Sequence, residues 1–150
     1  MPPAPSIRLI APDTSSAVLI GYSGGVDSTV LLHLLASDTA IRTRGLRALH
    51  VHHGLQPDAD LWADHCLRIC GSLDIDCEIA RVMVERDSGL GTEAAARQAR
   101  RAVFARILHA GETLALAHHR DDQAETVLLR ALRASGPDGL ASMRPWRDFA

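Results

Sequence analysis

Apolar residues are arranged along the chain in two patterns, short unbroken runs and longer stretches with helical spacing. Residues 17–20, Ala-Val-Leu-Ile, form a run that Gly21 closes, which is typical of a buried parallel strand. Residues 26–35 are apolar around most of the circumference of a helix, which predicts a helix buried against a sheet. Ser23, Gly24 and Gly25 lie between the two and predict a turn. The chain therefore opens its folded part with a strand, a glycine turn and a helix.

The same order of elements recurs further along the chain. We expect further strands at 46–51, 75–79 and 113–117, and further helices at 57–73, from Thr92 to about 108, and at 124–132. In 75–79 apolar and acidic residues alternate, which favours a half-exposed strand at the periphery of the sheet. Strands that alternate with helices predict an α/β fold with a mostly parallel sheet and helices on both faces. The proline-rich residues 1–16 predict a flexible leader, and 17–150 a single domain.

Composition narrows the classes of function. The 150 residues carry 16 basic and 18 acidic side chains, and every basic residue is Arg. Without Lys, a phosphate loop of the G-x-x-x-x-G-K-[ST] type and Schiff-base catalysis are both excluded. A net charge of -2 argues against a broad basic surface for nucleic acid, although a local Arg cluster remains available. No apolar run approaches the roughly 20 residues that cross a bilayer, so we expect no membrane-spanning segment.

The cysteines favour a reduced, cytoplasmic protein. Cys66, Cys70 and Cys77 are odd in number and form no C-x-x-C pair, and no secretory signal pattern precedes them. Cys66 and Cys70 fall on one helical face together with Trp62, Ile69 and Leu73. We therefore expect these two cysteines to be buried packing residues.

Polar clusters follow three of the expected strands. They are residues 22–28 (YSGGVDS), 50–54 (HVHHG) and 118–122 (HHRDD). Because ligands of parallel α/β sheets bind at the carboxyl ends of strands, three clusters at that edge predict one site.

The glycine turn carries the most specific chemistry. Gly24 and Gly25 allow backbone N–H groups to point at a common centre, and Ser23 and Ser28 add hydroxyl donors at the start of a helix. Together these groups can bind a phosphate. Asp27 would repel phosphate unless a divalent cation lies between them, which indicates magnesium. The alternative is a tight turn in which Asp27 and Ser28 act only as helix caps.

Two further groups of residues are candidates for catalysis. Arg97 and Arg100 are three positions apart and share a helix face, where guanidinium groups can grip phosphate. Alternatively they belong to a solvated stripe with Arg101 and Arg106. His118 can orient a nucleotide, or it packs in the core as lone histidines commonly do.

The loop and four other segments resemble a known family. SGGVDS at 23–28 resembles the phosphate loop of the N-type ATP pyrophosphatases, the PP-loop superfamily. The bacterial tRNA(Ile)-lysidine synthases have similar segments in the same order from about residue 17 to 144. These segments are 50–55 (HVHHGL), 93–100 (EAAARQAR), 118–126 (HHRDDQAET) and 135–140 (SGPDGL).

This resemblance implies a Rossmann-like adenine nucleotide alpha hydrolase fold and a two-step reaction. ATP would adenylate the C2 oxygen of the wobble cytidine in tRNA(Ile) with a CAU anticodon, and free L-lysine would displace AMP to form lysidine. The chain would be the N-terminal catalytic domain. ATP and Mg²⁺ are the implied cofactors, and tRNA(Ile) and lysine the substrates.

The resemblance also assigns roles to single residues. Residues 23–28, namely Ser23, Gly24, Gly25, Val26, Asp27 and Ser28, would hold the phosphates, and His50 and His52 would lie beside the adenosine. Asp27 and Glu125 would lie near magnesium or the lysine ammonium group. Of Asp121 and Asp122, one could cap the helix while the other binds metal or acts as a base, and we favour Asp122 for the second role. Arg97, Arg100 and His118 complete the catalytic set.

The chain departs from the family pattern in three places. Arg101 replaces a common Tyr, Ala134 replaces a common Gly, and the chain stops soon after Met143. We therefore expect a domain truncated at its C-terminal end, without the domains that grip tRNA, and unable to form lysidine alone.

The same residues also fit other functions. A metal-dependent hydrolase would use His50, His52, His118 and Asp122 as ligands, but leaves the glycine loop unexplained. A non-catalytic nucleotide-binding module, or another tRNA-modifying or amidating member of the superfamily, would share the loop. A 2-thiolation enzyme would require C-x-x-C cysteines, and Cys66 and Cys70 have one residue too many between them.

Overall fold

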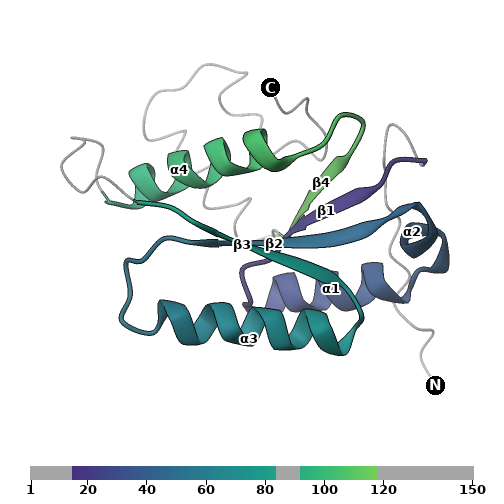
Figure 1. Ribbon diagram of the computed structural model, residues 1–150, viewed down its shortest axis with the longest axis horizontal. Helices are drawn as coiled ribbons and strands as arrows, with labels where there is room; N and C mark the ends of the chain where they lie inside the picture. The colour runs from purple at the N-terminus through teal and green to yellow at the C-terminus, as the bar shows by residue number, and fades with distance from the viewer. Residues whose placement is uncertain (1–14, 84–91, 118–150) are drawn as a thin grey trace, which may run out of the picture. The chain divides into compact units, whose positions relative to one another are not determined.

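A computed structural model describes residues 15–83 and 92–117 (Figure 1). Four strands, β1 (Val18–Gly21), β2 (Leu46–His52), β3 (Asp76–Arg81) and β4 (Thr113–Leu116), form a parallel sheet in the order β3-β2-β1-β4. Val18 is in register with Leu46 on one side and with Thr113 on the other. The predicted parallel sheet is confirmed, and β3 lies at an edge of the described sheet, as its alternating pattern indicated. All four strands belong to one compact unit, Ser15–Leu116.

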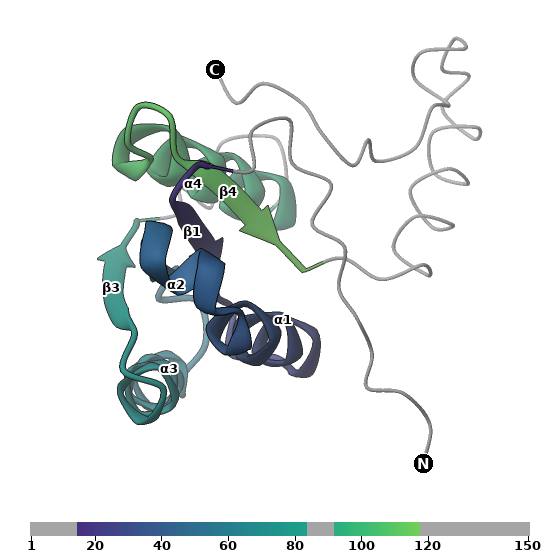
Figure 2. The ribbon, with the colours of Figure 1, turned by 90° about the vertical axis from the view of Figure 1, so that its right-hand side faces the viewer.

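Helices cover both faces of this sheet. α1 (Val26–Ser37) and α3 (Ala59–Ser72) lie on one face and α4 (Thr92–Ile107) on the other (Figures 1 and 2). The first three strands follow one another across the sheet from β1 to β2 to β3, and β4 then lies on the other side of β1. Because parallel crossovers are right-handed, this reversal places α4 opposite α1 and α3. Among the described residues, no helix has the length and apolar character that a membrane span requires.

The core lies between β1, β2 and the helices α1 and α3. Leu19 and Ile20 of β1 are fully buried, as is Leu32 of α1. α1 packs against the sheet, as predicted, but only along one side: Val26 and Val30 are 79% and 52% exposed. A helix that packs on one face of a sheet turns only one side toward it, and these two valines lie on the other side.

The sequence did not predict one helix, α2 (Thr39–Arg44). The Asp38 carboxylate caps it by accepting hydrogen bonds from the backbone N–H groups of Ala40 and Ile41 at 2.9 and 3.1 Å. α4 begins at Thr92, the residue expected to start it. The predicted helix at 124–132 and the leader up to residue 14 lie outside the described residues.

Candidate functional site

The glycine loop joins β1 to α1 and is held by its own hydroxyl groups. Gly24 has a φ of +82°, a left-handed conformation, and Gly25 is the N-cap of α1. The Ser28 hydroxyl donates to the Gly25 carbonyl oxygen at 3.1 Å, so in the 2.9 Å contact between the Ser23 and Ser28 hydroxyls Ser23 is the donor. The Ser23 oxygen also lies 3.3 Å from the Gly25 backbone nitrogen and accepts its proton. The predicted turn is therefore a hydrogen-bonded loop at a helix N-terminus.

Gly24 is packed against α3 so closely that a side chain cannot fit. A Cβ atom at this position would lie 2.8 Å from the Cys66 sulfur and 3.1 Å from Trp62 Nε1. Cys66 is fully buried, so it has little room to move. Both the backbone conformation and the packing therefore require glycine at position 24.

A cavity of about 280 Å³ opens beside this loop. Residues at the ends of β1, β2 and β4 line it together with residues of α3 and α4. Its lining includes the aromatic or apolar residues Tyr22, Trp62, Phe104 and Leu116 and the polar residues Ser23, His50, His52, His53 and Arg100. A mostly apolar hollow with a few polar groups, near the lower size limit of small-molecule pockets, is typical of a binding site. It lies at the strand ends, where the polar clusters predicted it.

His50 and His52 are both buried and each has one ring nitrogen engaged. His50 Nδ1 lies 2.9 Å from the Tyr22 carbonyl oxygen. A carbonyl only accepts, so Nδ1 carries the proton. Burial lowers the pKa of His50, which keeps the ring neutral and leaves Nε2 as an acceptor. The cavity wall thus holds a neutral imidazole of defined tautomer.

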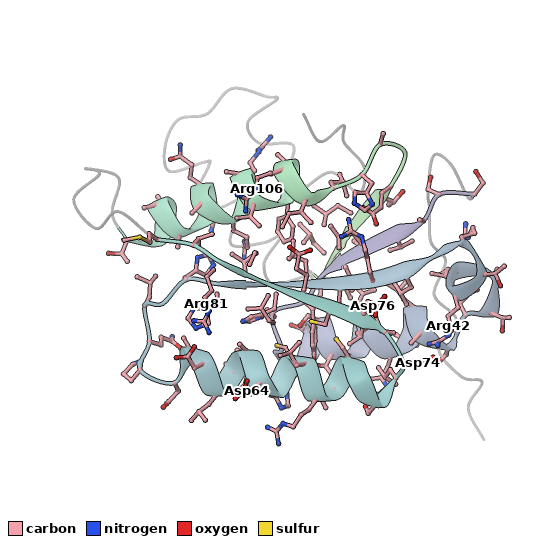
Figure 3. All side chains as sticks on the ribbon, viewed as in Figure 1. Arg42, Asp64, Asp74, Asp76, Arg81 and Arg106 are labelled. Carbon is pink, nitrogen blue, oxygen red and sulfur yellow. The ribbon has the colours of Figure 1, made fainter. Side chains whose placement is uncertain are left out.

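His52 is oriented by an ion pair at the end of β3. Its Nε2 lies 3.1 Å from an Asp60 carboxylate oxygen, which also accepts a 2.7 Å hydrogen bond from Arg81. The hydrogen bond from Arg81 is the main reason that the pKa of Asp60 is lowered. Arg81 Nη1 also lies 3.3 Å from the same His52 Nε2, so the imidazole, the carboxylate and the guanidinium form one cluster. Figure 3 shows Arg81 between the end of β3 and the first half of α3.

His53 and Arg100 both line the cavity, and the charge of Arg100 acts on His53. Burial, and then the charge of Arg100, lowers the pKa of His53, whose Nδ1 is buried without a hydrogen-bond partner among the described residues. Desolvation, followed by the charge of nearby Arg97, lowers the pKa of Arg100. Arg100 borders the cavity, whereas Arg97 does not belong to its described lining. Arg100 therefore borders the cavity, and Arg97, three residues earlier on α4, lies near enough for its charge to act on Arg100.

The remaining predicted site residues are placed only in part. Val26 and Asp27 are exposed in the first turn of α1. His118, Asp121, Asp122 and Glu125 lie outside the described residues. Within 15–83 and 92–117, no group of three His, Cys, Asp or Glu residues is arranged to hold a metal ion.

Sequence reasoning missed part of the cavity wall. The helical spacing predicts that Trp62 packs on one face with Cys66 and Cys70. Both cysteines are fully buried, but Trp62 is 48% exposed and borders the cavity. Its position in the first turn of a helix that follows a strand end was the available signal. Phe104 and Leu116 gave no signal, because apolar residues of a cavity wall resemble core residues in sequence.

Comparisons with known proteins show which sequences this chain resembles. A tRNA(Ile)-lysidine synthase of Xanthomonas axonopodis pv. citri (strain 306) is 70% identical over 133 residues, which are 89% of this chain and 30% of the relative. One from Xanthomonas campestris pv. campestris (strain 8004) is 64% identical over 141 residues, 94% of this chain and 32% of the relative. The chain thus spans about a third of the length of these curated relatives.

The fold and the family follow from two further comparisons. The solved structure of U34-tRNA thiolase NcsA from Methanococcus maripaludis with its 4Fe-4S cluster matches with a TM-score of 0.70 and 21% identity, covering 83% of this chain and 46% of that chain. This likeness supports the Rossmann-like fold. The profile of the PP-loop domain matches residues 5–150. Together with a glycine loop at the N-terminus of α1, this match shows that the chain belongs to the PP-loop domain family.

Proposed function

We propose that the loop 23–28 and the cavity beside it form one ATP site. The phosphates would lie against the backbone N–H groups and hydroxyls of the loop, where the N-terminus of α1 favours negative charge. The adenosine would enter the cavity, where His50 Nε2 offers an acceptor to its amino or hydroxyl groups and His52 lines the wall. Ser23 supports this assignment because it belongs both to the loop and to the lining of the cavity.

For the reaction, we propose lysidine formation on tRNA(Ile). ATP would adenylate the C2 oxygen of the wobble cytidine and release pyrophosphate, and the amine of lysine would then attack C2 and displace AMP. The observation that carries this choice is the 70% identity over 133 residues to a tRNA(Ile)-lysidine synthase. Adenylation suits the problem because a cytidine carbonyl carbon is a poor electrophile without a good leaving group.

Arg100 is the described residue best placed to assist adenylation. It borders the cavity, and its guanidinium can donate two hydrogen bonds to a phosphate group as negative charge develops. Arg97 would act on the same phosphates from further away. For His118, Asp122 and Glu125 the proposed catalytic roles rest on the family resemblance.

The residues present fit a magnesium ion bound together with ATP. Mg²⁺ usually takes one or two carboxylates and completes its coordination with phosphate oxygens and water. An exposed carboxylate, Asp27, lies in the first turn of α1, directly after the glycine loop. Asp27, with Glu125, would hold the ion, which would supply charge neutralisation to the phosphates.

The proposed substrates also define the setting in which the enzyme would work. Free lysine, ATP and uncharged tRNA meet in the cytoplasm, so we place the protein there. The tRNA would be bound largely outside this chain, since a net charge of -2 leaves no excess of positive charge for phosphate contacts.

A chimaeric enzyme tests this function. The corresponding first part of the Xanthomonas axonopodis enzyme is replaced by this chain, and the product is incubated with ATP, Mg²⁺, lysine and tRNA(Ile). We expect pyrophosphate release that depends on tRNA and lysidine in the digested tRNA by mass spectrometry. A tRNA with uridine at the wobble position serves as the control. A folded chimaera that binds ATP but forms no lysidine, beside an active parent enzyme, would contradict the proposed reaction.

A further inference from the structure

Two side chains of the cavity wall hold the backbone that leads into the glycine loop. Trp62 of α3 donates its indole N–H to the Ser23 carbonyl oxygen at 2.7 Å, and His50 of β2 donates Nδ1–H to the Tyr22 carbonyl oxygen at 2.9 Å. The two acceptors belong to consecutive residues. Trp62 and His50 also line the cavity, so the same two rings face the proposed adenosine position and grip the loop.

Fixing these carbonyl groups fixes the direction of the N–H groups beside them. In a planar trans peptide the C=O of one residue and the N–H of the next point in opposite directions. The hydrogen bond from Trp62 to the Ser23 carbonyl therefore sets the direction of the Gly24 N–H, and the bond from His50 sets that of the Ser23 N–H. These N–H groups belong to the segment proposed to bind phosphate.

Trp62 is itself held in place. Its ring stacks on His65 with centroids 5.3 Å apart, and its Nε1 lies directly behind Gly24. Yet 48% of the residue is exposed, so its indole is not a core-filling group like Cys66 beneath it. An exposed ring with a short hydrogen bond to a loop carbonyl is placed to orient that loop.

We propose that Trp62 is a positioning residue that links the cavity to the phosphate loop. Through the Ser23 carbonyl it holds the Gly24 N–H in the direction that a phosphate requires, while its ring borders the space for the base. This proposal rests on the proposed ATP site and adds a residue that acts on phosphate without touching it. Its consequence is that Trp62 contributes to the binding of ATP more than to the binding of adenosine.

The test compares two ligands and one substitution. Trp62→Phe keeps an aromatic ring at the cavity and removes the N–H donor. Dissociation constants for adenosine and for ATP with Mg²⁺ are measured by calorimetry for the unmodified chain and the variant. We expect ATP to bind about two- to tenfold more weakly, the effect of one lost hydrogen bond, while adenosine binding changes less than twofold.

The controls separate positioning from structure. Leu61→Ala changes the neighbouring exposed residue of α3 and should leave both constants unchanged. If Trp62→Phe fails to fold, benzothienylalanine, which replaces the indole N–H by sulfur, is incorporated at position 62 in a Trp146→Phe background. Equal weakening of ATP and adenosine, or no change in either, would overturn the positioning role and leave the ATP site intact. An unmodified chain that binds no ATP would overturn both.

Discussion

Replacing Gly24 by Ala tests whether the glycine loop is shaped by its packing on α3. At a φ of +82° a residue with a Cβ atom costs about 1–2 kcal/mol relative to its relaxed backbone. The new Cβ would also lie 2.8 Å from the Cys66 sulfur and 3.1 Å from Trp62 Nε1. Overpacking of this kind costs about 1–3 kcal/mol, so we expect the free energy of unfolding to fall by about 2–5 kcal/mol in total.

Gly111→Ala is the matched control. Gly111 also has a positive φ, +76°, but a Cβ there meets nothing within 4 Å. The free energy of unfolding of Gly111→Ala should fall only by the cost of the backbone conformation, about 1–2 kcal/mol. The difference between the two variants, measured by urea unfolding, isolates the overlap with α3. Gly24→Ala should also weaken ATP binding about tenfold or more, whereas Gly111→Ala should not.

A double-mutant cycle then identifies the neighbour responsible. Cys66→Ala removes the sulfur that the new Cβ would overlap. If the overlap is real, Gly24→Ala and Cys66→Ala together should destabilise the protein less than the sum of the separate changes. Equal unfolding free energies and equal ATP affinities for Gly24→Ala and Gly111→Ala would refute the reasoning.

Three further predictions follow from described residues. Asp27→Asn should weaken magnesium-dependent ATP binding by about 1–3 kcal/mol, which calorimetry with and without Mg²⁺ measures; unchanged affinity contradicts the metal role. Arg47→Ala should destabilise the protein by about 3 kcal/mol in urea unfolding, because Arg47 donates two hydrogen bonds, at 2.8 and 2.7 Å, to the buried Glu112 carboxylate. Burial raises the pKa of Glu112, but the hydrogen bonds from Arg47 help to lower it below its usual value overall. The stability that this ion pair contributes is therefore present above the unfolded pKa of Glu112 and is lost as the pH falls through the folded pKa. If the unfolding free energy of Arg47→Ala keeps the same dependence on acid pH, this explanation is contradicted. Arg100→Lys should slow pyrophosphate release in the chimaera more than Arg97→Lys while ATP still binds, and equal rates for the two variants would count against Arg100 at the cavity.

The elements that follow from simple patterns were predicted to within a few residues. The sequence of β1 is an apolar run because a central parallel strand is covered on both faces. α2 escaped prediction because it has only six residues and buries only Ile41, so its stability depends on the Asp38 cap rather than on a periodic face. The exposed valines of α1 show a further limit. Hydrophobicity on every side of a helix does not say which side meets the sheet.

The candidate site was predictable where backbone chemistry defines it. Two glycines with flanking hydroxyls after a strand predicted the turn and the helix N-terminus that the structure shows, and phosphate binding at this loop stays a proposal. The cavity wall was harder, because it depends on tertiary distances that spacing does not contain. Arg97 and Arg100 share a helix face in sequence, yet Arg100 borders the cavity and Arg97 is not in its described lining. Trp62 shares a face with Cys66 but lies one turn nearer the N-terminus of α3, where it borders the cavity.

The ATP site itself is tested most directly by a crystal structure of the chain with Mg²⁺ and a non-hydrolysable ATP analogue. We expect the base inside the cavity, within hydrogen-bonding distance of His50 Nε2 or of His52, and the phosphates against the N–H groups of residues 23–28. A nucleotide whose phosphates lie away from this loop, or whose base lies outside the cavity, would contradict the account.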